Sequence, residues 1–340
     1  MKALIAKIFG QKNVKSHYDF SQLNSVLVRP IGDAVGDAVA HIAHIQQIKQ
    51  AFPQLKIGVV VTERNREIYQ HISFIDQVLD NSLVSYLQQR NQWQLLLDFQ
   101  PSITTKTILS DFLLNAAIVI NFGKRYKKIY NLESMRNYDF IATIDDQTHI
   151  KDYLLFTPLK SYLKDPIKGY YLESSQLKPL SENHSKLRIL LNPQGSIREI
   201  LAEELNQLLL GIEEHLLADI EFVLPTGRNI ENYLAKLDSR FPIQLMEKMT
   251  TWEYFSLVKS ADLVIAVDGG GVHIACAYQK PLLAFYANQP KNIARWQPIN
   301  QAEHLMVIGK ELTEDNNATK NFPLENAINW LNQQLKKRIS

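Results

Sequence analysis

Short apolar segments alternate with segments of helical periodicity along two long stretches of the chain. In the first stretch, residues 37–51 place Val39, Ile42 and Ile45 on one apolar face at helical spacing. The strands expected around it cover residues 25–29, 56–61, 77–79, 92–99 and 116–122. Strands that alternate with helices predict a parallel sheet with right-handed crossovers.

The same alternation returns after residue 186. The strands expected there cover residues 187–191, 220–224, 243–246, 263–267, 281–286 and 305–308. One long helix is predicted over residues 199–217 and another over 324–337. Between the two stretches, residues 166–186 are rich in proline and serine and show little periodicity, which favours a linker.

The pattern therefore predicts an α/β protein of two Rossmann-like domains. The N-terminal domain covers residues 1–165, of which 1–24 form a basic extension, and the second domain covers 187–322. The closing helix of residues 323–340 could pack back toward the N-terminal domain. The lysines of the extension admit a surface helix at acidic lipid headgroups, but we favour a solvated extension.

Composition narrows the class of protein. The 340 residues are 46% apolar and 21% charged, as in a folded globular protein. A chain of this length is too long for a single hydrophobic core and suggests two domains. A formal net charge of +2 gives no reason to expect nucleic acid as a partner. The single cysteine, Cys276, is expected to be a buried packing residue. No apolar run reaches the ~18–20 residues that span a bilayer, and we expect a cytoplasmic protein.

Residues 262–277 form the most informative stretch. A buried strand leads into Asp268 and three glycines, and a helix follows at once. Glycines allow positive φ angles and a close approach of the backbone to a ligand. The start of the helix would direct N–H groups and the positive end of its dipole toward an anion such as a phosphate.

Two further loops follow strands of the second domain. Residues 192–198 contain Ser196 and Arg198, and residues 225–231 contain Glu231. A hydroxyl, a cation, glycine-bearing turns and a carboxylate would suit a nucleotide diphosphate and its ribose. Ligands gather at the carboxyl ends of parallel strands, so these loops are expected to converge.

The first domain offers a carboxylate in the corresponding place. Asp33 and Asp37 lie in two Gly-Asp pairs between the first strand and its helix. Either can cap the helix or act as a general base. His41 and His44 follow on one helical face, where burial or polar contacts are favoured over a metal site because no third strong ligand is apparent. The chain contains no GxGxxG after its first strand, no P-loop and no GxSxG elbow.

These motifs resemble glycosyltransferase family 9, the ADP-heptose:lipopolysaccharide heptosyltransferases. The family's C-terminal signature, Asp-Thr-Gly-Pro-x-His-x-Ala-x-Ala followed by Gly-Lys-Pro, is similar to residues 268–277 and 279–281 here. Its N-terminal signature resembles the strand, Gly-Asp loop, helix and Pro53 of the first domain. The departures are glycine at Gly269 instead of threonine and at Gly271 instead of proline.

The resemblance implies a GT-B fold, two Rossmann-like domains with parallel sheets facing across a cleft, and an inverting single displacement. It implies that Asp37 is the general base, with Asp33 as the alternative, and that Arg198 takes the place of a diphosphate-binding lysine. The resemblance also implies a donor site without a metal, made of Ser196, Arg198, Glu231, Asp268, Gly270, Gly271, Val272 and His273. The His273 side chain either contacts the donor or supports the loop.

The expected reaction moves a heptose from ADP-heptose to a sugar hydroxyl of the lipopolysaccharide or lipooligosaccharide inner core. The alternatives are a transferase for another nucleotide sugar, a nucleotide-sugar epimerase and a non-catalytic nucleotide-sugar-binding protein. No cofactor is expected, and Mg²⁺ could accompany the donor without protein ligands. The expected partners are the nucleotide sugar, the lipid A-core acceptor and, peripherally, the cytoplasmic face of the inner membrane.

Overall fold

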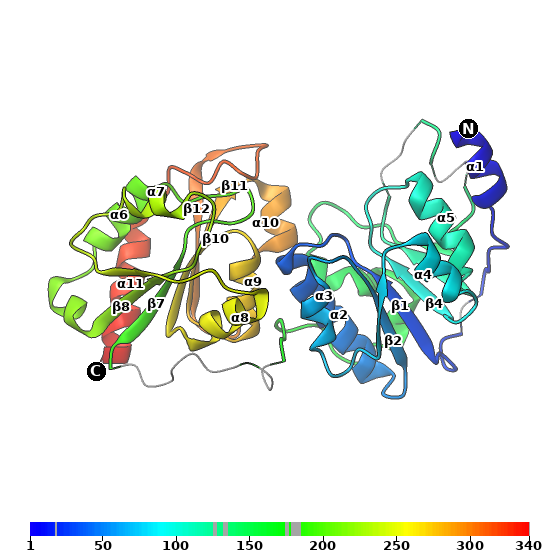
Figure 1. Ribbon diagram of the computed structural model, residues 1–340, viewed down its shortest axis with the longest axis horizontal. Helices are drawn as coiled ribbons and strands as arrows, with labels where there is room; N and C mark the ends of the chain where they lie inside the picture. Colours follow the sequence, from blue (N-terminus) through cyan, green and yellow to red (C-terminus); the bar gives the residue numbers. More distant parts are fainter. Residues whose placement is uncertain (18, 125–127, 132–134, 174–176, 178–184, 340) are drawn as a thin grey trace. The chain divides into compact units, whose positions relative to one another are not determined.

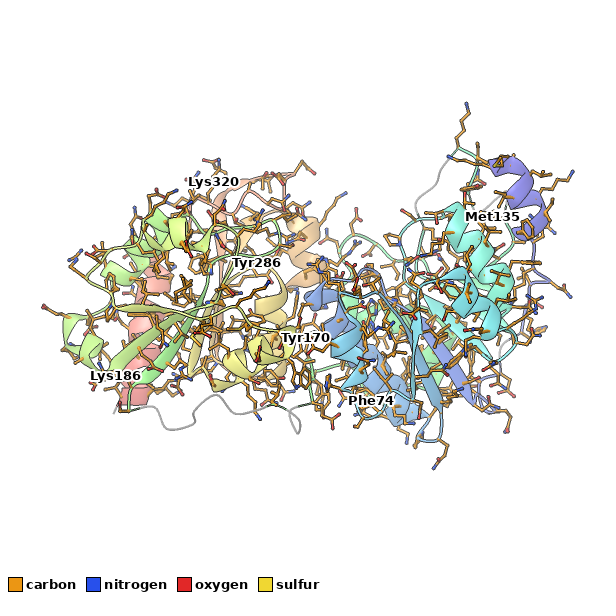
Figure 2. The ribbon with its side chains drawn as sticks, viewed as in Figure 1. Phe74, Met135, Tyr170, Lys186, Tyr286 and Lys320 are labelled. Atoms are coloured by element: carbon orange, nitrogen blue, oxygen red, sulfur yellow. The ribbon has the colours of Figure 1, made fainter. Side chains whose placement is uncertain are left out.

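The computed structural model describes residues 1–339 except residues 18, 125–127, 132–134, 174–176 and 178–184. The chain forms two compact units, Met1–Ile167 and Lys168–Ser340. In each unit, side chains from the helices pack onto a parallel sheet (Figure 2). The predicted α/β class is confirmed. The expected linker of residues 166–186 stays a prediction, since much of it lies outside the described residues.

The first unit is built on a six-stranded parallel sheet of order β3-β2-β1-β4-β5-β6 (Figure 1). Its strands are β1 Ser25–Arg29, β2 Lys56–Val61, β3 Gln77–Asp80, β4 Leu95–Asp98, β5 Ile118–Asn121 and β6 Phe140–Ile141. Its helices are α1 Lys2–Phe9, α2 Val35–Ala51, α3 Arg66–Gln70, α4 Leu83–Gln88, α5 Thr105–Leu114 and the 3₁₀ segments η1 Ile150–Phe156 and η2 Pro158–Ser161. Every residue of β1, β4 and β5 is buried, as expected for strands covered on both faces.

The second unit has a sheet of order β12-β11-β10-β7-β8-β9, again with parallel neighbours only. Its strands are β7 Leu187–Asn192, β8 Ile220–Leu224, β9 Ile243–Leu245, β10 Leu263–Val267, β11 Leu282–Asn288 and β12 His304–Leu312. Its helices are α6 Ala202–Leu210, η3 Glu214–Asp219, α7 Ile230–Leu234, α8 Thr251–Ser260, α9 Gly270–Ala277, α10 Pro290–Trp296 and α11 Leu324–Ile339. In both sheets, the second and third strands extend the sheet on one side of the first strand, and the fourth, fifth and sixth strands extend it on the other side.

The closing helix α11 packs within the second unit. Its buried residues Ala327, Leu331 and Leu335 join the apolar core formed by α6 and one face of the sheet. The proposed approach of this helix to the N-terminal domain stays a prediction.

The single helix predicted over residues 199–217 is wrong. α6 ends at Leu210, and the chain continues through Gly211 to the separate segment η3. A side chain at Gly211 would meet the Ile328 side chain at 2.6 Å, and the Asn332 amide donates to the Gly211 carbonyl at 2.8 Å. The α11 helix thus occupies the space through which a longer α6 would run.

The solvated N-terminal extension that we favoured is also wrong. Residues 2–9 form helix α1, whose Ala6 is buried in the core of the first unit. Lys12 forms an ion pair with the buried Asp139 and donates to the Ala117 carbonyl at 2.8 Å. The extension is therefore anchored by tertiary contacts between residues more than 100 positions apart, which local periodicity does not reveal.

No helix in the described parts of the chain has the length and apolarity needed to cross a membrane.

Candidate functional site

The loops predicted to bind a donor leave the sheet of the second unit at neighbouring strands. β7 and β10 are hydrogen-bonded, with Asn192 opposite Ala266 near their carboxyl ends. The chain continues from β7 toward one edge of the sheet and from β10 toward the other. A crevice between diverging connections is where open α/β sheets bind ligands.

The turn between β10 and α9 contains the glycine run. Gly269 caps α9 in an extended conformation (φ 163°), and none of the three glycines adopts the left-handed φ angles that the run was expected to need. Close packing explains Gly271, because a Cβ there would lie 2.1 Å from the Asn192 amide nitrogen and 2.8 Å from the Tyr254 hydroxyl. Gly269 has more room, since the nearest atom to a Cβ would be 3.7 Å away. The glycine at 271 brings the first turn of α9 against the end of β7.

Arg198 and Asp268 form a direct contact, as expected for two residues of one site. The Arg198 Nη1 atom lies 3.3 Å from Asp268 Oδ2 and 3.4 Å from the Asp268 carbonyl oxygen. Asp268 is buried, which raises the pKa of its carboxyl group, while Arg198 and a hydrogen bond from Asn292 oppose that rise. The ion pair and this hydrogen bond offset part of the cost of burying the carboxylate.

Two asparagines that sequence reasoning missed close this contact into a ring. The Asn292 amide donates to Asp268 Oδ2 at 2.7 Å, and the Asn316 amide donates to Asn292 Oδ1 at 3.3 Å. Arg198 Nε in turn donates to the Asn316 carbonyl oxygen at 2.9 Å. Asn292 lies on α10, shortly after β11, and no motif in the sequence marks it.

His273 lies inside the second unit on α9. Its ring packs edge-on against Tyr170, with centroids 5.2 Å apart, and lies 5.7 Å from the Trp296 ring. The His273 side chain is only 3% exposed. This position suits support of the loop, which was one of the two roles left open. Tyr170 is labelled in Figure 2.

The remaining predicted donor residues occupy different surroundings. Ser196 lies exposed at the tip of the loop after β7, and Glu231 is exposed in the first turn of α7. Val272 is buried, and its N–H donates to the Gly269 carbonyl oxygen at 3.2 Å. The loops of Ser196 and Glu231 approach one another, because Gln194 Oε1 would lie 2.4 Å from a Cβ at Gly227.

In the first unit, Asp37 is the carboxylate held inside the loop after β1. It lies in the first turn of α2, and its Oδ2 accepts a hydrogen bond from the Ala34 N–H at 3.4 Å. A Cβ at Gly32 would lie 2.2 Å from the same oxygen, so the loop wraps closely around the carboxylate. Burial, with a smaller contribution from Asp33, raises the pKa of Asp37 to about 6, against the lowering effect of the Ala34 hydrogen bond and of Arg64.

Asp33, the alternative base, lies in a more open position. Its side chain is 45% exposed and lies 3.6 Å from the Arg64 guanidinium. Its other oxygen accepts a hydrogen bond from the Thr62 hydroxyl at 3.3 Å. The two candidates therefore differ in environment: Asp37 is enclosed with a raised pKa, whereas Asp33 forms a surface ion pair.

His41 and His44 lie on α2 after this loop, and both are fully buried. Burial was the role that we favoured for them over metal binding. The Ile31 N–H donates to His41 Nε2 at 2.9 Å, and the Nδ1 atoms of the two histidines are 3.4 Å apart. His44 Nε2 lies 2.8 Å from the Ile150 carbonyl oxygen. One assignment satisfies all three contacts: both rings are neutral, with His41 carrying its proton on Nδ1 and His44 on Nε2. Burial lowers the pKa of both histidines, that of His44 to about 4. No group of three metal-binding side chains occurs among the described residues.

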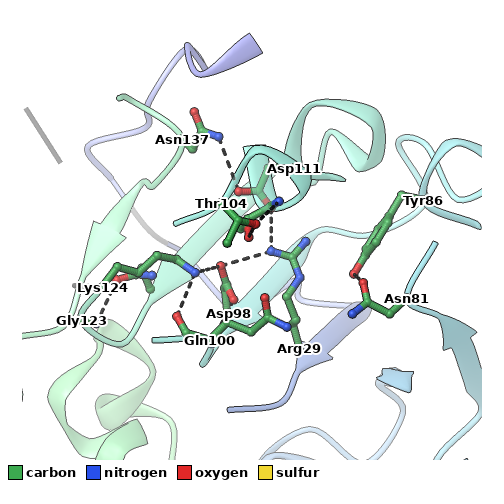
Figure 3. A network of polar contacts seen from close by, with 12 residues as sticks. Arg29, Asn81, Tyr86, Asp98, Gln100, Thr104, Asp111, Gly123, Lys124 and Asn137 are labelled. Atoms are coloured by element: carbon green, nitrogen blue, oxygen red, sulfur yellow. Dashed lines mark hydrogen bonds and ion pairs between the residues drawn. The ribbon is translucent and has the colours of Figure 1, made fainter. Parts of the chain in front are cut away.

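A buried ionic network that the sequence did not indicate lies at the β1–β4 switch point (Figure 3). Arg29 Nη1 is 3.2 Å from Asp98 Oδ2 and 2.8 Å from Asp111 Oδ1. Lys124 Nζ lies 2.7 Å from Asp98 Oδ2 and donates to the Gln100 carbonyl oxygen. Two cations and two carboxylates thus balance inside the unit and fix the ends of the central strands.

Comparison with known proteins supports the motif reading. Residues 219–326 match the model of glycosyltransferase family 9 (heptosyltransferase). The comparison with curated protein sequences gave no match.

Several solved structures have a similar fold over most of the chain. The glycosyl transferase family 9 protein from Veillonella parvula is 12% identical, with a TM-score of 0.68 over 92% of this chain and 97% of that one. ADP-heptose LPS heptosyltransferase II of E. coli is 13% identical, with a TM-score of 0.70 over 94% and 100%. E. coli heptosyltransferase WaaC with ADP is 13% identical, with a TM-score of 0.65 over 91% and 99%.

At such identities the structural likeness concerns the fold, and it confirms the predicted GT-B class with two Rossmann-like units. The family match falls on the second unit, across β8 to the start of α11. The predicted resemblance is therefore confirmed: residues 219–326 match glycosyltransferase family 9, and the class of enzyme that the chain resembles is a glycosyltransferase.

Proposed function

We propose that this protein is an inverting glycosyltransferase that moves a heptose from ADP-heptose to a sugar hydroxyl of a lipopolysaccharide inner core. The observation that carries the proposal is the site at the β7–β10 switch point. There, a family-matched glycine turn, a helix N-terminus and Arg198 come together.

The donor would bind to the second unit. The N-terminus of α9 offers N–H groups and the positive end of a dipole to a diphosphate. The ring contacts of Arg198 use Nε and Nη1, so Nη2 can donate to a phosphate oxygen. We propose that these groups stabilise the charge on the departing ADP, and that any Mg²⁺ arrives with the nucleotide rather than on protein ligands.

The acceptor would bind to the first unit with its hydroxyl at Asp37. With a pKa of about 6, this carboxyl group is ionised at neutral pH and is a stronger base than an ordinary aspartate. In the proposed step the hydroxyl oxygen forms a bond to the anomeric carbon, and its proton passes to Asp37. The bond from that carbon to the diphosphate oxygen breaks on the opposite face, which releases ADP and inverts the configuration.

The test is transfer from ADP-heptose to a heptose-deficient core acceptor, followed by ADP release and by the mass of the product. We expect Asp37→Asn to lower kcat by at least about 100-fold, while Asp33→Asn keeps most of the wild-type rate. Full activity in Asp37→Asn would overturn the choice of base. ADP release without acceptor modification would favour a protein that binds or hydrolyses the donor only.

The donor itself is tested by replacing ADP-heptose with UDP- and GDP-linked sugars. Selective transfer from one of these would redirect the proposal to a related transferase. A product that is an isomer of the donor would instead support an epimerase.

A further inference from the structure

The loop that joins β1 to α2 packs directly against the Asp37 carboxylate. It consists of residues 30–34, and we call it the β1–α2 loop. Its Gly32 lies so close that a Cβ there would be 2.2 Å from Asp37 Oδ2. The Ala34 N–H donates to the same oxygen at 3.4 Å. The position of the β1–α2 loop therefore controls the access of water to this carboxylate.

His41 holds the loop in this position. The Ile31 N–H, which directly precedes Gly32 in the chain, donates to His41 Nε2 at 2.9 Å. His41 is fully buried and lies on α2, four residues and thus about one turn after Asp37. One hydrogen bond therefore ties the loop to the helix that carries the carboxylate.

The surroundings of His41 keep Nε2 available as an acceptor. A neutral ring that accepts at Nε2 carries its proton on Nδ1, and this atom lies 3.4 Å from His44 Nδ1. His44 Nε2 lies 2.8 Å from the Ile150 carbonyl oxygen. The Phe99 ring packs edge-on against His41, with centroids 4.5 Å apart, and lies parallel to the His44 ring. These contacts restrict both the rotation and the tautomer of the His41 ring.

We propose that His41 is a positioning residue that keeps the β1–α2 loop closed over Asp37. Without the acceptor at position 41, the Ile31 N–H loses its partner and gains by moving toward water. Gly32 would then move away from the carboxylate, which would become solvated. The inference rests on the proposed function in naming Asp37 as the base, whereas the hold on the loop can be tested without any transfer.

Other groups also act on the Asp37 carboxylate. Burial raises its pKa to about 6, and the nearby charged groups are Asp33 in the loop and Arg64 after β2. Tyr69, which is buried on α3, also interacts electrostatically with Asp37. On the other side of the histidine pair, His44 interacts with His149 and Asp152 at η1. All of these groups remain in place when only residue 41 is changed.

The test compares His41→Leu with His41→Gln. Leucine fills much of the space of the ring and has no acceptor, whereas glutamine Oε1 can accept the Ile31 N–H in place of Nε2. We expect the pKa of Asp37 to fall from about 6 toward the ordinary 3.8 in His41→Leu and to return toward 6 in His41→Gln. NMR titration of ¹³C-labelled aspartate carboxyl groups measures this pKa, and Asp37→Asn identifies the signal.

A second variant leaves His41 itself intact. His44→Phe keeps an aromatic ring against Phe99 but removes the acceptor for the His41 Nδ1 proton. The tautomer of His41 is then no longer fixed, so the pKa of Asp37 should fall part of the way. Thermal unfolding shows that each variant folds, and His304→Leu, at an exposed histidine, is the matched control that should leave the pKa of Asp37 unchanged.

Transfer provides a further readout. In His41→Leu we expect kcat at neutral pH to fall by about tenfold, because a weaker base takes the proton less readily. The acid limb of the kcat profile should also move to lower pH. His41→Gln should restore most of the rate and return the limb to its original position, which a general loss of stability would not produce.

An unchanged pKa of Asp37 in folded His41→Leu and His44→Phe would overturn the proposal. An equal fall in His41→Leu and His41→Gln would do the same, since it would assign the effect to lost ring packing. Failure of the proposed function gives a different result. Transfer would then survive Asp37→Asn, while the pKa of Asp37 would still fall in His41→Leu and support the role of His41 in holding the loop.

Discussion

Asp37 combines two opposed effects in one side chain. Its enclosure by the loop after β1 raises the pKa to about 6, which strengthens it as a base. The same enclosure makes the ionised form costly to bury, because the hydrogen bond that the loop donates to the carboxylate, from the Ala34 N–H, is long at 3.4 Å. The carboxylate that we propose as the base is thus expected to lower the stability of the fold around it.

Asp37→Asn should therefore stabilise the protein, although the proposed mechanism requires that it slow transfer. The folded pKa lies above the ordinary value of 3.8, so the cost is present above pH 6 and disappears as the pH falls toward 4. We expect a gain in unfolding free energy on the order of 1 to 2 kcal/mol at pH 8 and a smaller one at pH 4.5. Urea unfolding at both pH values measures it. Asp33→Asn, at the exposed site, should show no such pH-dependent gain; an equal gain there would contradict this account.

The two glycines of the β10–α9 turn should respond differently to the same substitution. Gly271→Ala forces a methyl group against Asn192 and Tyr254 and should cost about 1–3 kcal/mol. Gly269→Ala places its methyl group in ordinary contact, and the extended backbone there accepts alanine. Comparison of thermal unfolding for the two variants measures this; equal stability would show that the contact at Gly271 relaxes without cost.

At the scale of elements, the buried histidines connect α2, the loop after β1 and η1. The chain of contacts runs from the Ile31 N–H through both rings to the Ile150 carbonyl oxygen. Spacing alone placed His41 and His44 on one helical face, but their partners come from a loop ten residues away and a 3₁₀ segment over 100 residues away. The metal alternative could not be dismissed from the sequence for that reason.

These histidines should make the first unit sensitive to acid. Their folded pKa values lie below 6.5, so the unfolded chain takes up protons that the folded chain does not, and stability falls as the pH drops from 6.5 toward 4. The sign is opposite to that of Asp37. His41→Gln/His44→Gln should lower stability at pH 8 and flatten the decline below pH 6.5, measured by urea unfolding across that range. The exposed His304→Gln is the control and should keep the wild-type slope; an unchanged slope in the double variant would refute the assignment.

Periodicity predicted most of the elements because strands buried on both faces are continuous apolar runs. It failed where tertiary contacts decide, as at Gly211, where Ile328 ends α6, and at α1, which is held by Phe112. The strand β6 and the helix α10 were not predicted either. A strand of two residues and a helix of seven residues that begins at Pro290 are too short to show a clear periodicity.

The sequence predicted which residues belong to the candidate site, but it did not predict how they contact one another. The glycine run, Arg198 and Asp268 were identified because chemistry gathers at strand ends. Their closure into a ring through Asn292 and Asn316 depends on loops that follow β11 and β12, and no sequence spacing relates these to Arg198.

At the scale of the whole molecule, each unit has its own sheet and core. A ligand that binds one unit should therefore protect that unit from thermal unfolding. ADP at 100 times its Kd should stabilise the second unit by about 2.7 kcal/mol. Arg198→Ala should lose most of this protection, as measured by thermal unfolding with ADP, UDP and GDP in turn.

Asn316→Ala is the matched control, because it breaks one bond of the ring and leaves the Arg198 side chain in place. It should keep the protection by ADP. Equal loss in both variants would assign the effect to the ring and not to a phosphate contact.

The two sheets repeat one strand order, and each is completed by consecutive residues: Met1–Ile167 in the first case and Lys168–Ser340 in the second. Among the residues that the structure describes, every strand of the first sheet comes from the first unit. During synthesis, the first unit can therefore form its whole hydrogen-bonded ladder while the second is still being translated. The ribosome would release a nascent chain whose first unit is already folded, and only the second unit would have to fold after termination.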